Sequence, residues 1–253
     1  MAIDKIKMLK TILKSANLYH QELENKEILL LVKKDKDIVG YKIEFNTYNF
    51  KHFTGVKSEL SANVFYQKSI TNSLLPDDFS IDDEFLVEKK SSVLESAMKL
   101  PYTAKMLGDF KYAGIKIEAD LGAGNTCYIM AFRNKQGENL YPVSVMKEDV
   151  RNSTSPTSPI VAILRKGIKE SIYTELTYKS KNINFDKLHF PKEIQNMISP
   201  KIMQQLKPQM NMETVENTVS VKQKIAEKRE IIAQNQKLKD TTQSKKKSVE
   251  NEL

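Results

Sequence analysis

The spacing of hydrophobic residues predicts a helix followed by a hairpin at the start of the chain. Apolar residues recur every three or four positions over residues 3–23 with charged residues between them, which is typical of an amphipathic helix. Residues 27–33 and 38–46 are rich in Ile, Leu and Val and flank the charged stretch 34–37, which favours a β-hairpin. Helical spacing returns over residues 61–71.

The next part of the chain has weaker patterns. Residues 79–89 alternate weakly, which predicts a strand. Ser92-Val-Leu-Glu95 has the form of a capping box, in which hydroxyl and carboxyl groups accept hydrogen bonds from free backbone amides, so a helix is expected to begin there. Pro101 interrupts this pattern, and residues 102–107 predict a short second helix.

Residues 114–178 predict most of a β-sheet. The candidate strands are residues 115–119, 126–132, 141–147, 159–164 and 172–178. The first alternates between apolar and charged residues, and the others are rich in β-branched and aromatic residues. Most connections are too short to hold crossover helices, so the sheet is expected to be largely antiparallel.

The predicted organisation has four parts. They are an N-terminal helix (1–24), a central domain (25–180), a short helical extension (181–212) and a polar tail (213–253). In the extension, Ser199 followed by Pro200 resembles a helix start. Sparse apolar residues predict an exposed helix over 213–239, and the remaining residues are expected to be disordered.

Composition and charge narrow the functional classes. The net charge of +8 over 253 residues favours a polyanionic partner such as nucleic acid. The single cysteine, Cys127, falls in a predicted apolar strand, which fits a reducing compartment. No apolar run approaches the ~18 residues that span a membrane, so a cytoplasmic protein without a membrane partner is expected. No Gly-rich phosphate loop and no Cys/His cluster occurs, so neither cofactor nor metal is expected.

The segment Asn49-Phe-Lys-His-Phe-Thr-Gly55 holds the strongest candidate for chemistry. His52 lies between two aromatic residues, and a hydroxyl group and a glycine follow. An unperturbed imidazole titrates near pH ~6.5 and can accept or donate a proton. The alternative is a structural histidine whose ring nitrogens are bound by backbone groups at a strand end.

A second candidate is the charged corner Lys147-Glu-Asp-Val-Arg151, which follows a predicted strand. Its two cations suit a phosphate, since a guanidinium group offers a planar pair of donors to phosphate oxygens. Its two carboxylates could hold the arginine in place. The alternative is a surface network of ion pairs.

Several separated motifs, taken in order, resemble a known family. They are Asn49-Phe-Lys-His-Phe-Thr-Gly55, Phe65-Tyr66, Thr103-Ala-Lys-Met-Leu-Gly-Asp109, Lys147-Glu-Asp-Val-Arg151 and Tyr173-Thr-Glu-Leu-Thr-Tyr178. The chain resembles the phage-associated Barnase-EndoU-Colicin-RelE-like (BECR) nuclease domains, specifically their fourth phage-borne subgroup. The resemblance covers roughly residues 25–180, so the central domain is expected to be a BECR-like nuclease domain.

The resemblance implies an α+β fold, with helices packed on a mainly antiparallel sheet of four to six strands and an open face that holds RNA. The C-terminal helical tail, which the sequence itself predicts, lies outside the resemblance. The resemblance also implies metal-independent cleavage of RNA, in which the 2′-hydroxyl attacks the adjacent phosphorus and leaves a 2′,3′-cyclic phosphate. His52 would be the principal acid or base, and Lys147 and Arg151 would hold the phosphate. Glu148 or Asp149 would orient the arginine or carry a second proton. Thr54 and Tyr173 could donate hydrogen bonds to the scissile group.

These assignments require His52 and the charged corner to converge across one exposed β surface. Two alternatives stay open: a non-catalytic nucleic-acid-binding module, and a protein of a phage or mobile element that recruits a partner through residues 213–239. The expected partner is RNA, with tRNA and mRNA as candidates, in the cytoplasm of a bacterial host. An inhibitor protein is a further candidate partner, because an unrestrained, toxin-like ribonuclease would harm its host.

Overall fold

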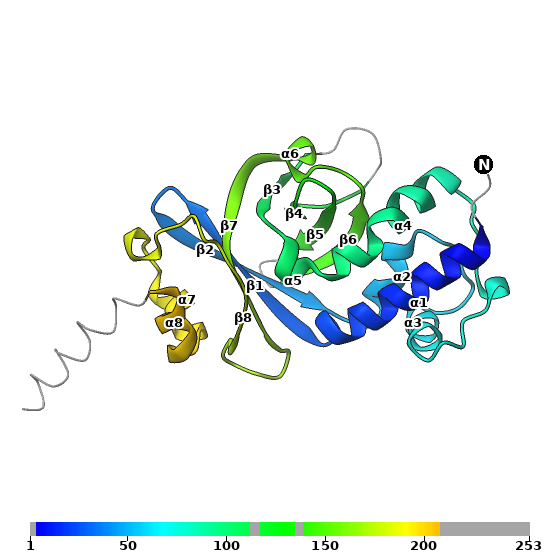
Figure 1. Cartoon of the computed structure of the whole chain (residues 1–253), viewed down its shortest axis with the longest axis horizontal. Coiled ribbons are helices and arrows are strands. Elements are labelled where there is room, and N and C mark those ends of the chain that lie inside the picture. Colours follow the sequence, from blue (N-terminus) through cyan, green and yellow to red (C-terminus); the bar gives the residue numbers. More distant parts are fainter. Residues whose placement is uncertain (1–3, 112–116, 135–138, 208–253) are drawn as a thin grey trace, which may run out of the picture. The chain divides into compact units, whose positions relative to one another are not determined.

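The computed structural model describes residues 4–111, 117–134 and 139–207 (Figure 1). The chain divides into two units, Met1–Leu206 and Lys207–Leu253, and all features below belong to the first. The predicted tail, residues 213–253, lies outside the described residues, as does part of the predicted strand 115–119. The four-part division of the chain therefore stays a prediction.

The described residues form eight strands and a set of mostly short helices. The strands are β1 Lys26–Lys34, β2 Asp37–Phe45, β3 Met106–Phe110, β4 Leu121–Gly124, β5 Ile129–Asn134, β6 Leu140–Met146, β7 Thr154–Gly167 and β8 Glu175–Lys179. The α-helices are α1 Lys5–Glu22, α2 Asn49–Thr54, α3 Ala62–Ile70, α4 Glu84–Met98, α5 Leu100–Thr103, α6 Val150–Ser153, α7 Lys192–Met197 and α8 Pro200–Leu206. Two 3₁₀ turns, η1 Pro76–Asp78 and η2 Phe185–Lys187, complete the described elements.

Seven of these strands close into a barrel. The strand order is β1-β2-β6-β5-β4-β3-β7-β8, and β1 also pairs with β7, so the sheet returns on itself. Among the described residues the pairings are antiparallel except that of β2 with β6, which is parallel and for which one pair, Ile43 and Leu140, is seen. β8 extends the sheet beyond the ring by pairing with β7.

The expected fold class, an open and mainly antiparallel sheet of four to six strands covered by helices, is wrong. The structure is an eight-stranded mixed sheet with a closed barrel, and the length of β7 is the reason. Its 14 residues pair with β3 in their first part and with β1 and β8 in their second part. Alternation along the chain indicates that a strand exists, but not which partners it has.

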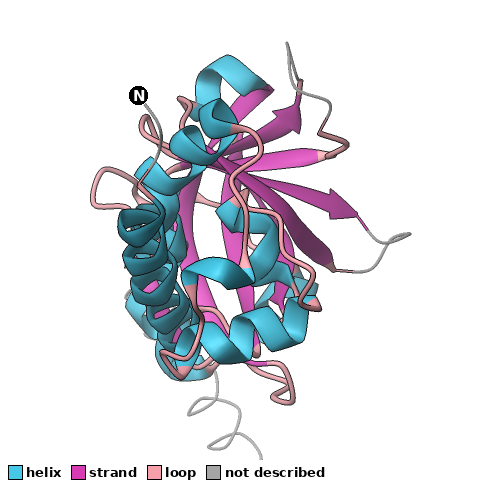
Figure 2. Ribbon diagram, turned by 90° about the vertical axis from the view of Figure 1, so that its right-hand side faces the viewer, coloured by secondary structure: helices cyan, strands magenta, loops and turns pink. Residues whose placement is uncertain are grey.

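The N-terminal prediction is confirmed. The hairpin of β1 and β2 is antiparallel, and its turn follows Lys34. The α1 helix begins after Asp4, whose side chain accepts a hydrogen bond from the Ile6 amide at 2.8 Å. One face of α1, including Tyr19, is buried in the core that α1 shares with α3, α4 and the barrel. Figures 1 and 2 show the helices grouped beside the strands.

The predictions for residues 79–107 are partly wrong. No strand occupies residues 79–89, because α4 begins after Asp83, whose carboxylate accepts from the Leu86 amide at 2.9 Å. The supposed capping serine, Ser92, lies inside this helix and donates to the Lys89 carbonyl. Asp and Glu are favourable in a first helical turn, where free amides carry partial positive charge. The acidic run that looked like a weak strand is therefore a helix start.

Two smaller corrections concern the sheet region. The predicted helix 102–107 ends early, because α5 stops at Thr103 and β3 begins at Met106. Cys127 is exposed in the turn between β4 and β5 rather than buried in a strand, and its amide donates to Asn125 Oδ1 at 2.7 Å. Among the described residues, none of the helices has the length and apolar content that a bilayer crossing requires.

Candidate active site

The short helix α2 buries its phenylalanines and exposes His52. Phe50 and Phe53 are fully buried, and their rings lie 5.5 and 6.1 Å from that of Tyr19. Replacing a buried phenylalanine by alanine typically costs ~3–5 kcal/mol, so these anchors hold the helix firmly. Because the two anchors are three residues apart, the positions between them turn outward, and His52 is exposed.

A glycine and a lysine define the end of α2. Gly55 has a φ of 78°, and a side-chain carbon at this position would approach Lys90 Cδ to 2.9 Å. Only glycine adopts this backbone without strain. Lys90, from α4, is 7 % exposed and donates from Nζ to the His52 carbonyl at 2.9 Å. The backbone that carries His52 is therefore tied to a second helix.

Partial burial is the largest cause that lowers the pKa of His52, followed by the nearby charges of Lys90 and Lys51. All three causes disfavour the imidazolium ion, so the ring stays neutral down to a lower pH than the ring of an ordinary histidine does. No described residue forms a hydrogen bond with its ring nitrogens. The structure therefore does not support the alternative of a histidine saturated by backbone groups.

The two lysines beside His52 bind backbone carbonyls and also lower the pKa of His52 by their charge, after the larger effect of burial. Lys51 donates from Nζ to the carbonyls of Ser58 and Leu60, at 2.7 and 2.6 Å. Burial lowers the pKa of Lys90 to about 8. Sequence reasoning missed Lys90, although it lies on the apolar stripe of α4 with Val87 and Leu94. A lysine on such a stripe is the signal that could have identified it.

Thr54 and Tyr173 are both fully buried, and their hydroxyl protons are donated inside the protein. Thr54 donates to the Lys51 carbonyl at 2.8 Å. Tyr173 donates to Glu27 Oε1 at 2.5 Å, and Lys166 lies 3.0 Å from the same carboxylate. In this structure both hydroxyl groups therefore stabilise the fold and are not presented to a substrate.

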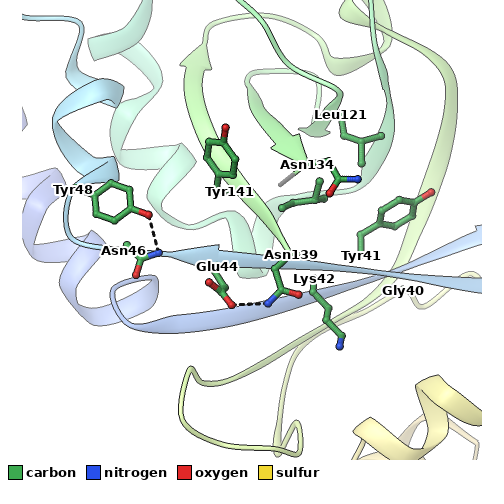
Figure 3. A pocket seen from close by; sticks show the side chains of 11 residues that line it. Gly40, Tyr41, Lys42, Glu44, Asn46, Tyr48, Leu121, Asn134, Asn139 and Tyr141 are labelled. Atoms are coloured by element: carbon green, nitrogen blue, oxygen red, sulfur yellow. Dashed lines mark hydrogen bonds between the residues drawn. The ribbon is translucent and has the colours of Figure 1, made fainter. Parts of the chain in front are cut away.

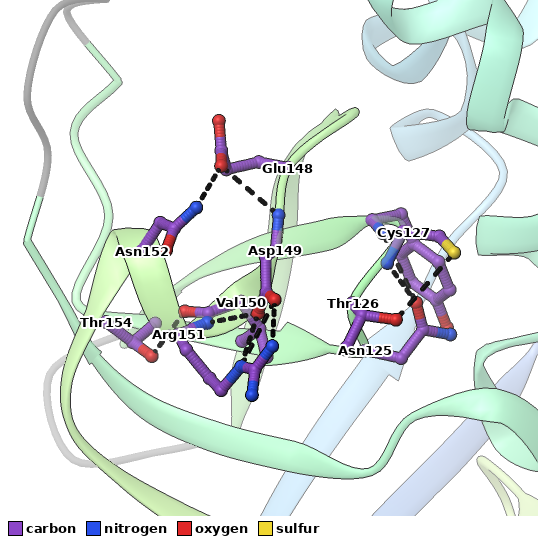
Figure 4. A network of polar contacts seen from close by, with 10 residues as sticks. Asn125, Thr126, Cys127, Glu148, Asp149, Val150, Arg151, Asn152 and Thr154 are labelled. Atoms are coloured by element: carbon purple, nitrogen blue, oxygen red, sulfur yellow. Dashed lines mark hydrogen bonds and ion pairs between the residues drawn. The ribbon is translucent and has the colours of Figure 1, made fainter.

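Arg151 and Asp149 of the charged corner form an ion pair with each other (Figure 4). Asp149 accepts from the Arg151 amide at 2.9 Å and from Arg151 Nε and Nη2 at 3.0 and 2.5 Å, so one carboxylate both caps α6 and binds the guanidinium. These hydrogen bonds lower the pKa of Asp149. Glu148 instead accepts from Asn152 at 2.9 Å. Asp149 is thus the carboxylate that orients Arg151, a choice that the sequence left open, while Lys147 is exposed.

The structure does not bring His52 and the corner together. His52 belongs to α2, which lies with α1, α3 and α4, whereas α6 lies at the barrel rim beside β3 (Figure 1). The cations that shift the pKa of His52 are Lys90 and Lys51, and neither belongs to the corner. The expected single β surface is replaced by two separate sites, one on a helix and one at the rim.

The described residues lack a metal-binding cluster, and a protein family matches most of the chain. Within residues 4–111, 117–134 and 139–207, no group of three His, Cys, Asp or Glu side chains could hold a metal ion. A family model described as phage-Barnase-EndoU-ColicinE5/D-RelE like nuclease4 matches residues 11–182. No curated protein and no solved structure gave a match. The matched range includes α2, the charged corner and every strand described above.

Proposed function

The chain belongs to the phage-Barnase-EndoU-ColicinE5/D-RelE like nuclease family, fourth group, and from this membership we propose that it is a metal-independent endoribonuclease whose proton-accepting group is His52. The observation that carries the proposal is the exposed imidazole held on α2 by buried anchors, with a pKa that partial burial and the charges of Lys90 and Lys51 lower. A nuclease needs such a group at its surface, because RNA has to reach it.

The proposed reaction is a transesterification within RNA. The 2′-oxygen forms a bond to the adjacent phosphorus while the bond from phosphorus to the 5′-oxygen breaks, which leaves a 2′,3′-cyclic phosphate and a 5′-hydroxyl. His52 takes the proton of the 2′-hydroxyl, a role that its lowered pKa favours. The leaving 5′-oxygen takes a proton from water, because Glu148 and Asp149 belong to the corner rather than to α2.

The corner has a supporting part in this proposal. Lys147 and Arg151 contact a phosphate that flanks the scissile one, because they are separated from α2. Basic side chains that bind the RNA backbone position it without reading its sequence. Arg151 has to share its guanidinium with Asp149, so its contribution is modest.

Cleavage of total tRNA and of mRNA in excess chelator, followed by analysis of the RNA ends, tests the proposal. We expect 2′,3′-cyclic phosphate ends in chelator, and their loss with His52→Ala. His189→Ala is the matched control, because this histidine is 71 % exposed and pairs with Asp37 away from α2. Cleavage that requires a divalent metal, or that survives His52→Ala, contradicts the mechanism. Binding of RNA without any cleavage indicates a non-catalytic nucleic-acid-binding module instead.

A further inference from the structure

A cavity of about 820 Å³ opens beside α2 where two barrel strands separate (Figure 3). β2 and β6 are joined only by the pair Ile43 and Leu140 among the described residues, so from Tyr141 onward β6 is not paired with β2. The side chains that matter below are Tyr41, Glu44, Asn46, Tyr48, Asn139 and Tyr141. The cavity is therefore a product of the barrel seam and not of the motif that carries His52.

The lining combines aromatic rings with polar groups that face the same space. Tyr41, Tyr48 and Tyr141 contribute three rings, and amide and carboxylate groups lie among them (Figure 3). Unpaired RNA bases are recognised in this way, by stacking on aromatic side chains and by hydrogen bonds to base edges. Tyr48 is 48 % exposed, so a ligand can reach its ring, and its hydroxyl accepts from Asn46 Nδ2 at 3.4 Å.

A partly buried chain of hydrogen bonds holds the carboxylate of this cavity in place. Asn139 donates from Nδ2 to Glu27 Oε2 at 2.8 Å and to Glu44 Oε1 at 2.6 Å. Glu27 is 6 % exposed and is bound in turn by Tyr173 and Lys166. The second oxygen of Glu44 accepts no hydrogen bond from any residue in the described ranges. This oxygen can accept from the amino group of a base.

The cavity adjoins His52 through α2. Tyr48 precedes the helix with helical dihedral angles, φ −70° and ψ −15°, and lies four residues before His52. Residues four apart share one helix face, with Cβ atoms about 5–6 Å apart. A base stacked on Tyr48 therefore places its own ribose and phosphate within reach of the imidazole.

We propose that this cavity binds one unpaired nucleobase of single-stranded RNA, stacked on Tyr48 and Tyr141 with its amino group bound by Glu44. The inference rests on the proposed ribonuclease function only in giving the cavity its substrate. Adenine, cytosine and guanine carry an exocyclic amino group, and uracil does not. The protein therefore prefers RNA with one of the first three bases beside the cleaved bond.

The test measures binding without cleavage, using fluorescein-labelled 2′-O-methyl pentanucleotides of adenine, of uracil and without bases. Methylation removes the attacking hydroxyl proton, so fluorescence anisotropy reports binding alone. We expect adenine to bind more tightly than uracil, and both more tightly than the abasic chain. Tyr48→Ala should weaken adenine binding about tenfold and leave abasic binding unchanged, since stacking on an aromatic ring accounts for this order of affinity.

Matched variants separate the ring from its hydroxyl and from the fold. Tyr48→Phe keeps the ring and should restore binding, whereas Glu44→Gln should reduce the preference for adenine over uracil. Tyr102→Ala, at a tyrosine 39 % exposed outside the cavity, should bind as wild type does. Equal binding of the adenine and abasic chains, or no effect of Tyr48→Ala, overturns the proposal.

The outcomes also distinguish this proposal from that of ribonuclease activity. Base-dependent binding in a protein that cleaves no RNA supports the cavity and contradicts the nuclease mechanism. Cleavage without base-dependent binding does the reverse.

Discussion

The helix α2 and the charged corner at α6 use similar residues to opposite effect. At the corner, Asp149 neutralises Arg151 two residues away, so cation and carboxylate satisfy each other. Beside His52, Lys51 of α2 and Lys90 of α4 donate to backbone carbonyls instead, and neither forms an ion pair with a carboxylate of the described residues. Partial burial is the largest cause that lowers the pKa of His52, and the charges of these two lysines lower it further. We infer from this difference that a charged side chain can act on a reacting group only when no oppositely charged residue of the same motif neutralises it.

The largest effect expected from this comparison is on the cleavage rate. His52→Ala should slow RNA cleavage by ~10²–10⁴-fold, the range typical of a lost acid or base. Arg151→Ala should change the rate less than about tenfold and reduce the salt dependence of RNA binding by about one unit of slope, because it removes one backbone contact. Single-turnover cleavage assays give the rates of both variants, and RNA binding measured over a salt series gives the slope. A larger loss with Arg151→Ala would reverse the roles assigned to the two sites.

A second prediction concerns the buried lysine under α2. Burial lowers the pKa of Lys90 from 10.5 to about 8, so between these values the unfolded chain holds a proton that the folded chain has lost. Stability therefore rises with pH across this window. Relative to Lys90→Met, wild type should gain about 3 kcal/mol of unfolding free energy from below pH 8 to above pH 10.5.

Urea unfolding of both proteins at the two ends of that window measures this difference. Lys99→Met, at the exposed lysine that follows the last residue of α4, is the control. A stability difference between wild type and Lys90→Met that stays constant with pH would mean that the Lys90 ammonium is not desolvated in solution. Lys90 would then not be the buried cation that helps to lower the pKa of His52.

A third and smaller effect separates the two roles of Asp149. Asp149→Asn keeps a good N-cap residue for α6 and removes the charge that binds Arg151. We expect little change in Tm but stronger RNA binding, because Arg151 becomes available to phosphate. Asp149→Ala removes the cap as well and should lower Tm by roughly 2–4 °C. Thermal melts and anisotropy with the uncleavable pentanucleotides measure both, and unchanged RNA binding in Asp149→Asn would show that Arg151 does not contact phosphate.

The sequence predicted elements that depend on local patterns and missed those that depend on distant partners. Helix α1 and the hairpin of β1 and β2 followed from periodicity, because one buried face determines each of them. Barrel closure was missed, because it depends on β7 meeting both β1 and β3. Ser92 and Glu95 matched a capping box by residue type alone, while the true cap, Asp83, lay in a run read as a weak strand.

The candidate site shows the same division. The sequence singled out His52 from its aromatic neighbours, and those neighbours are the anchors that expose it. It did not indicate that the corner would be separate from α2, since a motif spacing contains no information about the path of the chain between motifs. Lys90 approaches His52 from α4, and Tyr48 lies one helical turn before His52. Both positions become interpretable only when the helices are placed.

The smallest predicted effect is a shift in the pH dependence of cleavage. As a base, His52 acts only when neutral, so the rate should rise with pH through its folded pKa, which lies below the ordinary 6.5. Lys90→Met removes one of the two cations that lower this pKa, so the midpoint of the rise should move to higher pH. Single-turnover cleavage across the acidic range measures both midpoints, and Arg151→Ala should leave the midpoint where it is. A rate that instead falls as pH rises through this range would make His52 the acid of the reaction.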